Sequence, residues 1–110
     1  MMPVEHDLYC YRGQSWKQPL YFEISDQPLD LSGTIVKAQI RPSENNTVLT
    51  AEMNCAIYAG EGKLVLSLSS EETAKIIPGV YRYDVMVTDD LGEVTYYIFG
   101  KFIMKGRVTK

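Results

Sequence analysis

Residues 79–92 read GVYRYDVMVTDDLG and carry the clearest strand signal in the chain. From Val80 to Thr88 the side chains alternate, and one face carries Tyr81, Tyr83, Val85 and Val87. Because successive side chains of a β-strand point to opposite faces, this pattern predicts a strand with one buried face. The following residues 89–92, Asp-Asp-Leu-Gly, predict a hairpin turn. We therefore expect residues 93–103 to pair back as a long final strand.

Tyr81 occupies a position with a known role in immunoglobulin-like domains. In these sandwiches a tyrosine near the start of a strand bonds through its hydroxyl to the turn just upstream. Tyr83 stands where antibody domains place a cysteine, so an inter-sheet disulfide is not expected. We predict Tyr81 and Tyr83 to be core residues.

Earlier segments show the same alternation. Residues 34–41 place Val36, Ala38 and Ile40 on one face, and residues 63–68 place Leu64, Leu66 and Leu68 on one face. Residues 15–24 place Trp16, Leu20, Phe22 and Ile24 together, which predicts that Trp16 is a core residue. Pro19 cannot donate to a strand ladder, so this strand should lie at an edge or be interrupted. We also expect strands at 8–11, 47–53 and 57–59.

One helix signal interrupts the strands. Ser69 followed by Glu72 forms a capping box, and Pro78-Gly79 should stop the helix after about two turns. The sequence thus predicts an all-β fold, an immunoglobulin-like two-sheet antiparallel β-sandwich of about seven strands with one short helical turn before the penultimate strand. We expect a single domain over residues 1–110, with its core at about 8–104 and a C-terminal tail at 105–110.

Composition disfavours nucleic acid and membranes as partners. The 110 residues carry a net charge of −3, without a basic run that would follow a phosphate backbone. No apolar stretch approaches the roughly 20 residues that span a bilayer. The first seven residues lack the cations and apolar run of a signal peptide, so we expect synthesis for the cytoplasm and discount the Asn45-Asn46-Thr47 glycosylation triplet.

No residue pattern predicts catalysis or a cofactor. His6 is the one histidine, and the chain has no phosphate-binding, dinucleotide or zinc motif, so we expect no enzyme, no cofactor and no metal. Glu71-Glu72 and Asp89-Asp90 suit capping and turn roles, with a calcium site of Asp89 and Asp90 joined by Asp26 or Asp30 as the alternative. Cys10 and Cys55 should be thiols, although a bridge between them stays open.

Aromatic residues on the final strand are the remaining pointer to function. Tyr97 and Phe99 share a parity opposite to that of Tyr96, Ile98 and Phe102, so the two sets cannot face one core. One set is therefore exposed, covered by a loop or by the N-terminal segment with Tyr9 and Tyr11, or covered by a partner. Aromatic anchors are enriched in protein interfaces, and we predict Tyr97 and Phe99 as partner contacts.

Several short strings, taken in order, resemble the small immunoglobulin-like domain of tailed bacteriophage and prophage structural regions, similar to the N-terminal domain of baseplate upper proteins. The strings are YRGQSW at 11–16, LDLSG at 29–33, AQIR at 38–41, LSLS at 66–69 with ETA at 72–74, and GVYRYDV at 79–85. Gly92 and Gly100-Lys101 continue the pattern, so the resemblance spans roughly residues 8–104.

The resemblance implies a virion structural role in the phage tail or baseplate, after synthesis in the bacterial cytoplasm, with no catalytic residues. The implied partners are tail or baseplate proteins, and a homo-oligomer is an alternative. A second hypothesis, from the aromatic residues, is a carbohydrate-binding sandwich that attaches to cell surfaces.

Overall fold

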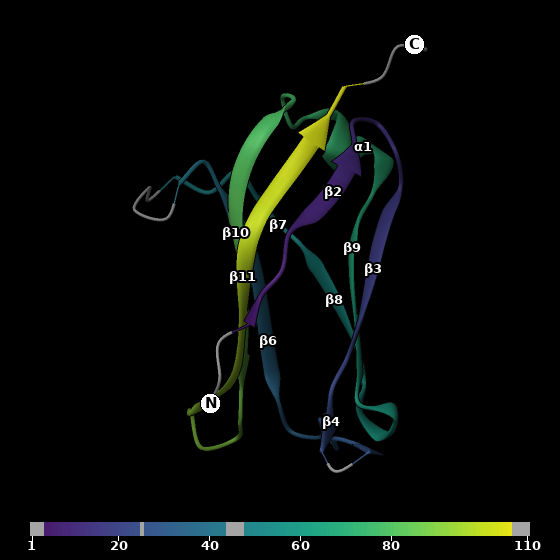
Figure 1. Ribbon diagram of the computed structural model, residues 1–110, viewed down its shortest axis with the longest axis vertical. Helices are drawn as coiled ribbons and strands as arrows, with labels where there is room; N and C mark the ends of the chain where they lie inside the picture. The colour runs from purple at the N-terminus through teal and green to yellow at the C-terminus, as the bar shows by residue number, and fades with distance from the viewer. Residues whose placement is uncertain (1–3, 25, 44–47, 107–110) are drawn as a thin grey trace.

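The structure is a computed structural model that describes residues 4–24, 26–43 and 48–106. Two sheets pack face to face (Figure 1). The six-stranded sheet contains β1 (Val4–Glu5), β2 (Leu8–Tyr11), β11 (Val94–Lys105), β10 (Gly79–Thr88), β6 (Ile35–Arg41) and β7 (Ala51–Glu52). The three-stranded sheet contains β3 (Trp16–Tyr21), β9 (Lys63–Leu68) and β8 (Asn54–Tyr58). A small pair, β4 (Glu23–Ile24) with β5 (Gln27–Pro28), lies apart from both.

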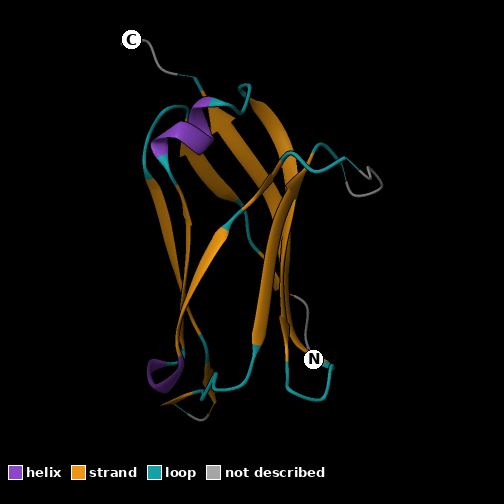
Figure 2. Ribbon diagram, turned by 180° about the vertical axis from the view of Figure 1, so that it is seen from behind, coloured by secondary structure: helices purple, strands orange, loops and turns teal. Residues whose placement is uncertain are grey.

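The predicted all-β, immunoglobulin-like sandwich is confirmed. Seven of the strands in the described residues are four residues or longer, and four more are two-residue pairings. The order β3-β9-β8 corresponds to strands B, E and D of an immunoglobulin domain, and β6, β10 and β11 correspond to C, F and G. Figure 2 shows the α-helix α1 (Ser70–Ala74) at one end of the sandwich and a 3₁₀ turn (Ala59–Glu61) at the other.

One edge of the sandwich departs from antiparallel pairing. Both β1 and β2 pair with β11 in parallel. Parallel neighbours need a long connection between them, and here most of the chain lies between β2 and β11. The last strand also runs one residue into the predicted tail, because Lys105 pairs with Tyr11. Residues 107–110 lie outside the described part of the chain.

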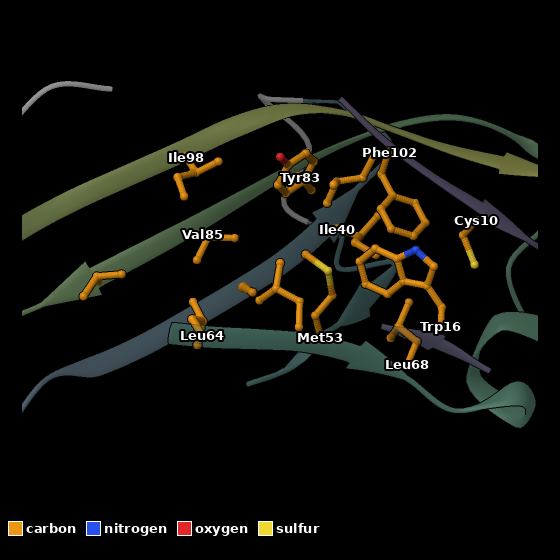
Figure 3. Close-up of a cluster of buried hydrophobic side chains, with 14 of the residues drawn as sticks. Cys10, Trp16, Ile40, Met53, Leu64, Leu68, Tyr83, Val85, Ile98 and Phe102 are labelled. Atoms are coloured by element: carbon orange, nitrogen blue, oxygen red, sulfur yellow. The ribbon is translucent and has the colours of Figure 1, made fainter. Parts of the chain in front are cut away.

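The core lies between the two sheets (Figure 3). From β10, Tyr83, Val85 and Val87 are buried as their alternation predicted, and they share one hydrophobic core with the buried leucines of β9. Ala38 and Ile40 of β6 are also fully buried. Trp16 is buried, and its ring meets that of Phe102 edge to face at 5.4 Å between centroids. Trp16 Nε1 donates a hydrogen bond to the Tyr9 carbonyl at 3.0 Å, which ties β3 to the other sheet.

Strand β3 lies at the edge of its sheet, as Pro19 predicted, and the strand runs through the proline without interruption. Leu20 packs partly buried against the core, and Phe22 is buried just beyond the strand. The side chain of Ile24 lies outside the described part.

Tyr81 lies at the margin of the core instead of within it. The side chain is partly buried and packs against the core cluster. Its hydroxyl donates to the Ile77 carbonyl at 2.6 Å, four residues upstream, which is the bond expected of an immunoglobulin-like tyrosine corner. This hydrogen bond holds the ring near the exposed turn and so keeps it at the margin of the core. Tyr83 next to it is buried, and burial raises the pKa of its phenol above the ordinary value, with the Asp7 carboxylate adding to the effect.

The middle of the chain differs most from the prediction. In place of one strand at 47–53, the structure has the two-residue β7 and then β8 in the opposite sheet. Met53 lies between them, and its N–H donates to the Ala38 carbonyl at 2.8 Å while its side chain is buried. The chain therefore changes sheets at Met53, which a strand pattern cannot reveal. Residues 44–47, with the glycosylation triplet, lie outside the described residues.

The predicted capping box of α1 is present. Ser69 Oγ accepts from the Glu72 N–H at 3.1 Å, and Glu72 Oε1 accepts from the Ser69 N–H at 2.9 Å. The helix ends at Ala74, shorter than the two turns predicted, since Ile76 already turns into the core. In the part of the chain described here, no helix is long and apolar enough to cross a membrane.

We predict that replacing Glu72 with Gln changes how stability depends on pH. The hydrogen bond from the Ser69 N–H, together with those from the Ser69 and Asn54 side chains, lowers the pKa of Glu72 below its ordinary value of 4.5. A lowered carboxyl pKa stabilises the fold above the unfolded pKa, and this contribution is lost as pH falls through the folded pKa. In urea unfolding, the excess stability of wild type over Glu72→Gln should be constant above about pH 6 and shrink below the ordinary pKa. A difference that did not vary with pH would contradict this role.

The chain between β1 and β2 approaches the core side of Gly100. His6 N–H donates to the Phe99 carbonyl at 2.9 Å, and the Tyr83 hydroxyl donates to the His6 carbonyl. Asp7 Oδ1 accepts from the Lys101 N–H at 3.0 Å, so a side chain replaces one ladder bond of the strand pair. A Cβ on residue 100 would overlap the His6 carbonyl group. Glycine at 100 is therefore what lets the N-terminal segment dock.

We predict that Gly100→Ala destabilises the protein by about 1–3 kcal/mol, because the methyl group must displace backbone that it cannot push aside cheaply. The measurement is urea unfolding, with amide hydrogen exchange at His6 to detect release of the segment. Gly60→Ala is the matched control, since a Cβ there meets nothing within 4 Å, and it should stay within about 0.5 kcal/mol of wild type. Equal stability of the two variants would refute the account.

Candidate functional site

The candidate site is the outer face of the six-stranded sheet, meaning the side chains of β6, β10 and β11 that point away from the core. Strand register arranges these side chains in rows. One row is Lys37, Met86 and Tyr97, the next is Gln39, Asp84 and Phe99, and the third is Arg41, Arg82 and Lys101. Three strands that are distant in sequence thus build one continuous surface.

Tyr97 and Phe99 form the aromatic centre of the outer face. The parity predicted for β11 is confirmed, because Ile98 and Phe102 are buried in the core. The rings of Tyr97 and Phe99 stack on each other with centroids 5.7 Å apart and planes inclined by 23°. Tyr97 Oη donates to Asp84 Oδ2 at 3.1 Å. Both side chains are half-buried, and the side chain of Tyr96 lies outside the described part.

A hollow of about 330 Å³ opens beside these rings. Its walls come from all three strands and from Ser43 after β6, and the lining residues are Gln39, Arg41, Ser43, Arg82, Tyr83, Asp84, Tyr97, Phe99 and Gly100. Arg41 Nη2 donates to Gln39 Oε1 at 2.9 Å, which orders one wall. The hollow is thus lined by guanidinium, amide and carboxylate groups next to an aromatic surface.

The N-terminal segment lies beside this face and does not cover it. Strands β1 and β2 extend the sheet in its own plane along β11. Tyr9 and Tyr11 are exposed, with Lys105 Nζ 5.3 and 5.9 Å from their ring centroids. The expectation that these tyrosines might cover Tyr97 and Phe99 is therefore wrong, since parallel pairing with β11 holds them at the edge.

A second aromatic group, on the outer face of the three-stranded sheet, was missed at the level of sequence. Tyr21 and Tyr58 both lie opposite Lys63 in the strand register and are exposed. Lys63 Nζ lies 5.8 Å from the Tyr21 ring centroid and 5.2 Å from that of Tyr58. The alternation in residues 63–68 predicts that Lys63 points outward. Its contact with Tyr21 and Tyr58, however, depends on the pairing of β3, β9 and β8.

Away from the outer face, the acidic side chains and thiols that could take part in chemistry have structural roles. Asp89 Oδ1 accepts from the N–H groups of Leu91 and Glu93, each at 2.9 Å, and Asp30 accepts from Ser32. These bonds fit the turn roles, and the described residues hold no cluster of three metal-ligating side chains. Cys10 and Cys55 are free thiols, so the alternative of a bridge is wrong. Burial raises the pKa of each thiol to about 11, with Glu52 adding to the effect at Cys55.

Comparisons with known proteins give a fold and no family. No protein-family model matches the chain, and no curated protein matches its sequence. The N-terminal domain of ORF48 of phage TP901-1 superposes with a TM-score of 0.50 at 12% identity, over 94% of this chain and 99% of that domain. The internalin-like protein lmo2027 of Listeria monocytogenes superposes with a TM-score of 0.47 at 14% identity. The match includes 94% of this chain, which spans only 28% of the length of the internalin-like protein.

A further match is the extracellular domain of the voltage-gated sodium channel β4 subunit, with a TM-score of 0.45 at 11% identity over 96% of this chain and 89% of that one. At these identities a structural match reports architecture alone. The chain therefore shares its sandwich fold with a domain of a phage protein.

Proposed function

We propose that the protein is a non-enzymatic structural component of a phage or prophage virion, located in the tail or baseplate, which acts by binding other proteins through its outer face. The observation that carries the proposal is the stacked, half-buried Tyr97–Phe99 pair beside a hollow on the outer face of the six-stranded sheet. The shared fold with a phage protein domain supports the phage assignment.

The physical case rests on what a partner would gain at this face. Aromatic side chains are enriched at interface centres. Full burial of an exposed apolar side chain is worth roughly 1.5–3 kcal/mol, and for the half-buried Tyr97 and Phe99 a partner gains the part that is still exposed. Phe99 and Tyr97 are held in place by stacking and by the bond to Asp84, so little side-chain freedom is lost on binding. A partner surface that covers the pair gains apolar burial at low entropic cost.

The non-enzymatic part of the proposal is supported by the way reactive groups are used. His6 is exposed in the N-terminal segment, and its backbone N–H donates to the Phe99 carbonyl at the strand edge. The burial-raised pKa values of the thiols leave little thiolate at neutral pH. The neighbouring genes provide a simple further check, since tail or baseplate genes beside this one would name the candidate partners.

We predict that the double variant Tyr97→Ser/Phe99→Ser weakens binding to tail or baseplate proteins by at least about tenfold, because the aromatic anchor is removed. The measurement is the affinity of the purified chain for the immobilised proteins that the neighbouring genes encode. Tyr21→Ser/Tyr58→Ser is the matched control, since it removes two exposed tyrosines from the opposite face. Unchanged affinity of the first variant, or equal loss in both, would count against the proposed face.

A carbohydrate-binding module for cell-surface attachment is the second candidate, favoured by the hollow itself. An aromatic ring flanked by Gln39, Arg41 and Asp84 resembles the stacking surface and polar rim that sugars require. We predict that, if this function holds, binding on a glycan panel is saturable and is lost in Phe99→Ala but kept in Tyr21→Ala. A panel without binding would leave protein assembly as the function.

A further inference from the structure

The outer edges of the two main sheets differ in how they are closed. Along β3, Pro19 has no N–H to offer, and its carbonyl accepts from Gln18 Nε2 at 3.1 Å. Along β2, the Tyr9 carbonyl accepts from Trp16 Nε1 at 3.0 Å. Strands β1 and β7 are only two residues long. Features of this kind keep the edge of a sheet from pairing with another chain.

The edge of β8 carries no such feature. This strand ends the three-stranded sheet, and no strand in the described part of the chain pairs with its other side. Its sequence, NCAIY at 54–58, contains no proline, glycine or charged residue, and four of its five side chains are exposed. In Figure 2, β8 crosses diagonally on the side of the sandwich that faces the viewer. An uncharged edge of this kind is open to another strand.

Strand register shows which backbone groups bond within the three-stranded sheet. Phe22 and Gly62 continue the register of β3 and β9, and the Phe22 N–H donates to the Gly62 carbonyl at 2.8 Å. Hydrogen-bonded and non-hydrogen-bonded pairs alternate along an antiparallel ladder. Counting from this pair, Leu64 and Leu66 bond to β3, and Val65 between them bonds to β8.

The same alternation identifies the free backbone groups of β8. Val65 lies opposite Ala56, so the N–H and carbonyl of Ala56 bond within the sheet. Its neighbours Cys55 and Ile57 therefore direct their N–H and carbonyl groups to the open edge. Each of the two residues can donate one hydrogen bond and accept one there.

Two bonds just beyond β8 confirm this direction and mark the ends of the open stretch. The Met53 N–H donates to the Ala38 carbonyl at 2.8 Å, and the Ala59 carbonyl accepts from the Leu31 N–H at 3.1 Å. Positions 53 and 59 share the parity of 55 and 57, and both bond away from β9. The open stretch is therefore residues 55–57.

We infer that two copies of this chain pair through their β8 edges, antiparallel about a two-fold axis at Ala56. Cys55 of each copy lies opposite Ile57 of the other, and each of these residues donates and accepts a backbone hydrogen bond. The two three-stranded sheets join into one continuous sheet. Because the same stretch serves in both copies, the contact is isologous and closes as a dimer.

The side chains of β8 suit a second copy as the occupant. At the axis the exposed Ala56 meets its equivalent in a non-hydrogen-bonded pair, where Cα atoms approach to about 4.5 Å and a small side chain fits. Ile57 is 39% exposed and gains an apolar neighbour in Cys55 of the other copy. The paired stretch has no charged side chain, so the two copies set no like charges opposite each other.

Charges beside the strand favour the antiparallel direction. Asn54 Nδ2 donates to Glu72 Oε1 at 3.1 Å at one end, and Lys63 Nζ lies 5.2 Å from the Tyr58 ring centroid at the other. Antiparallel pairing brings the Glu72 end of each copy to the Lys63 end of the other. Two further exposed carboxylates lie off the line of the strand, in β7 and in the 3₁₀ turn: Glu52 and Glu61.

This pairing leaves the surface that carries the proposed function free. Tyr97 and Phe99 belong to the other sheet, and edge-to-edge pairing keeps the outward side chains of β8, including Tyr58, on the surface of the joined sheet. A dimer formed in this way presents two outer faces to partners. The inference thus goes beyond the proposed function and does not depend on it.

The test places charges on the two-fold axis of the full-length chain. Ala56→Lys and Ala56→Glu change an exposed side chain, and each variant alone sets like charges opposite each other. Sedimentation velocity should show that wild type forms dimers as its concentration rises, and that each variant alone associates at least about tenfold more weakly. An equal mixture of the two variants should recover dimers, because opposite charges then meet at the axis.

Two control variants change the net charge by the same amounts at exposed sites away from the edge. Lys17→Gln matches Ala56→Glu, and Glu71→Gln matches Ala56→Lys. Both controls should dimerise like wild type. Urea unfolding of all four variants checks that they remain folded.

Amide hydrogen exchange of wild type provides a second measurement that needs no variant. The N–H groups of Cys55 and Ile57 should exchange more slowly as the protein concentration rises. The Ala56 N–H bonds within its own sheet, and its exchange should not change with concentration.

Three results would overturn the inference: a wild type that stays monomeric, association of the Ala56 variants equal to that of wild type, or a mixture that does not recover dimers. The second result would place the contact on another surface. Exchange at Cys55 and Ile57 that is independent of concentration would count equally against it. A monomeric wild type that still binds tail proteins would remove this inference and leave the proposed function standing.

Discussion

Strand β10 is paired along most of its length with β11 on one side and β6 on the other, and this double pairing sets the layout of the molecule. The buried Tyr83, Val85 and Val87 fix one face of the sheet against the leucines of β9. Because side chains alternate, the same pairing directs Arg82, Asp84 and Met86 outward and aligns them with the outward residues of both neighbours. The same strand register thus determines both the core face and the candidate binding face of the sheet.

Much of the fold could be predicted because its signals are local. The alternation in β10, the leucines of β9, Pro19 in an edge strand, and the capping box of Ser69 and Glu72 each depend on residues close in sequence. The switch of sheets at Met53 and the parallel pairing of β2 could not be predicted, since neither leaves a periodic trace. The same holds for Gly100, where the need for glycine comes from His6, almost the whole chain away.

The candidate site, too, could be predicted from the sequence only in part. Parity alone placed Tyr97 and Phe99 on the face opposite to Phe102, whereas their stacking, the hollow and the alignment of Arg41 with Lys101 depend on the register of β6, β10 and β11. Arg41 and Lys101 are 60 positions apart in the numbering, and only folding brings them to one line. A surface assembled from three strands suits a protein that acts by contact, because recognition needs a placed set of anchors and no reacting group.

The central claim is that this outer face is covered by another protein in an assembled phage particle. The most direct measurement is hydroxyl-radical footprinting of the chain in purified particles, compared with the isolated chain. The account predicts that Tyr97 and Phe99 are labelled less in particles, while Tyr21 and Tyr58 on the opposite face are labelled as in the isolated chain. Absence of the chain from particles, or equal labelling of Tyr97 and Phe99 in both samples, would contradict it.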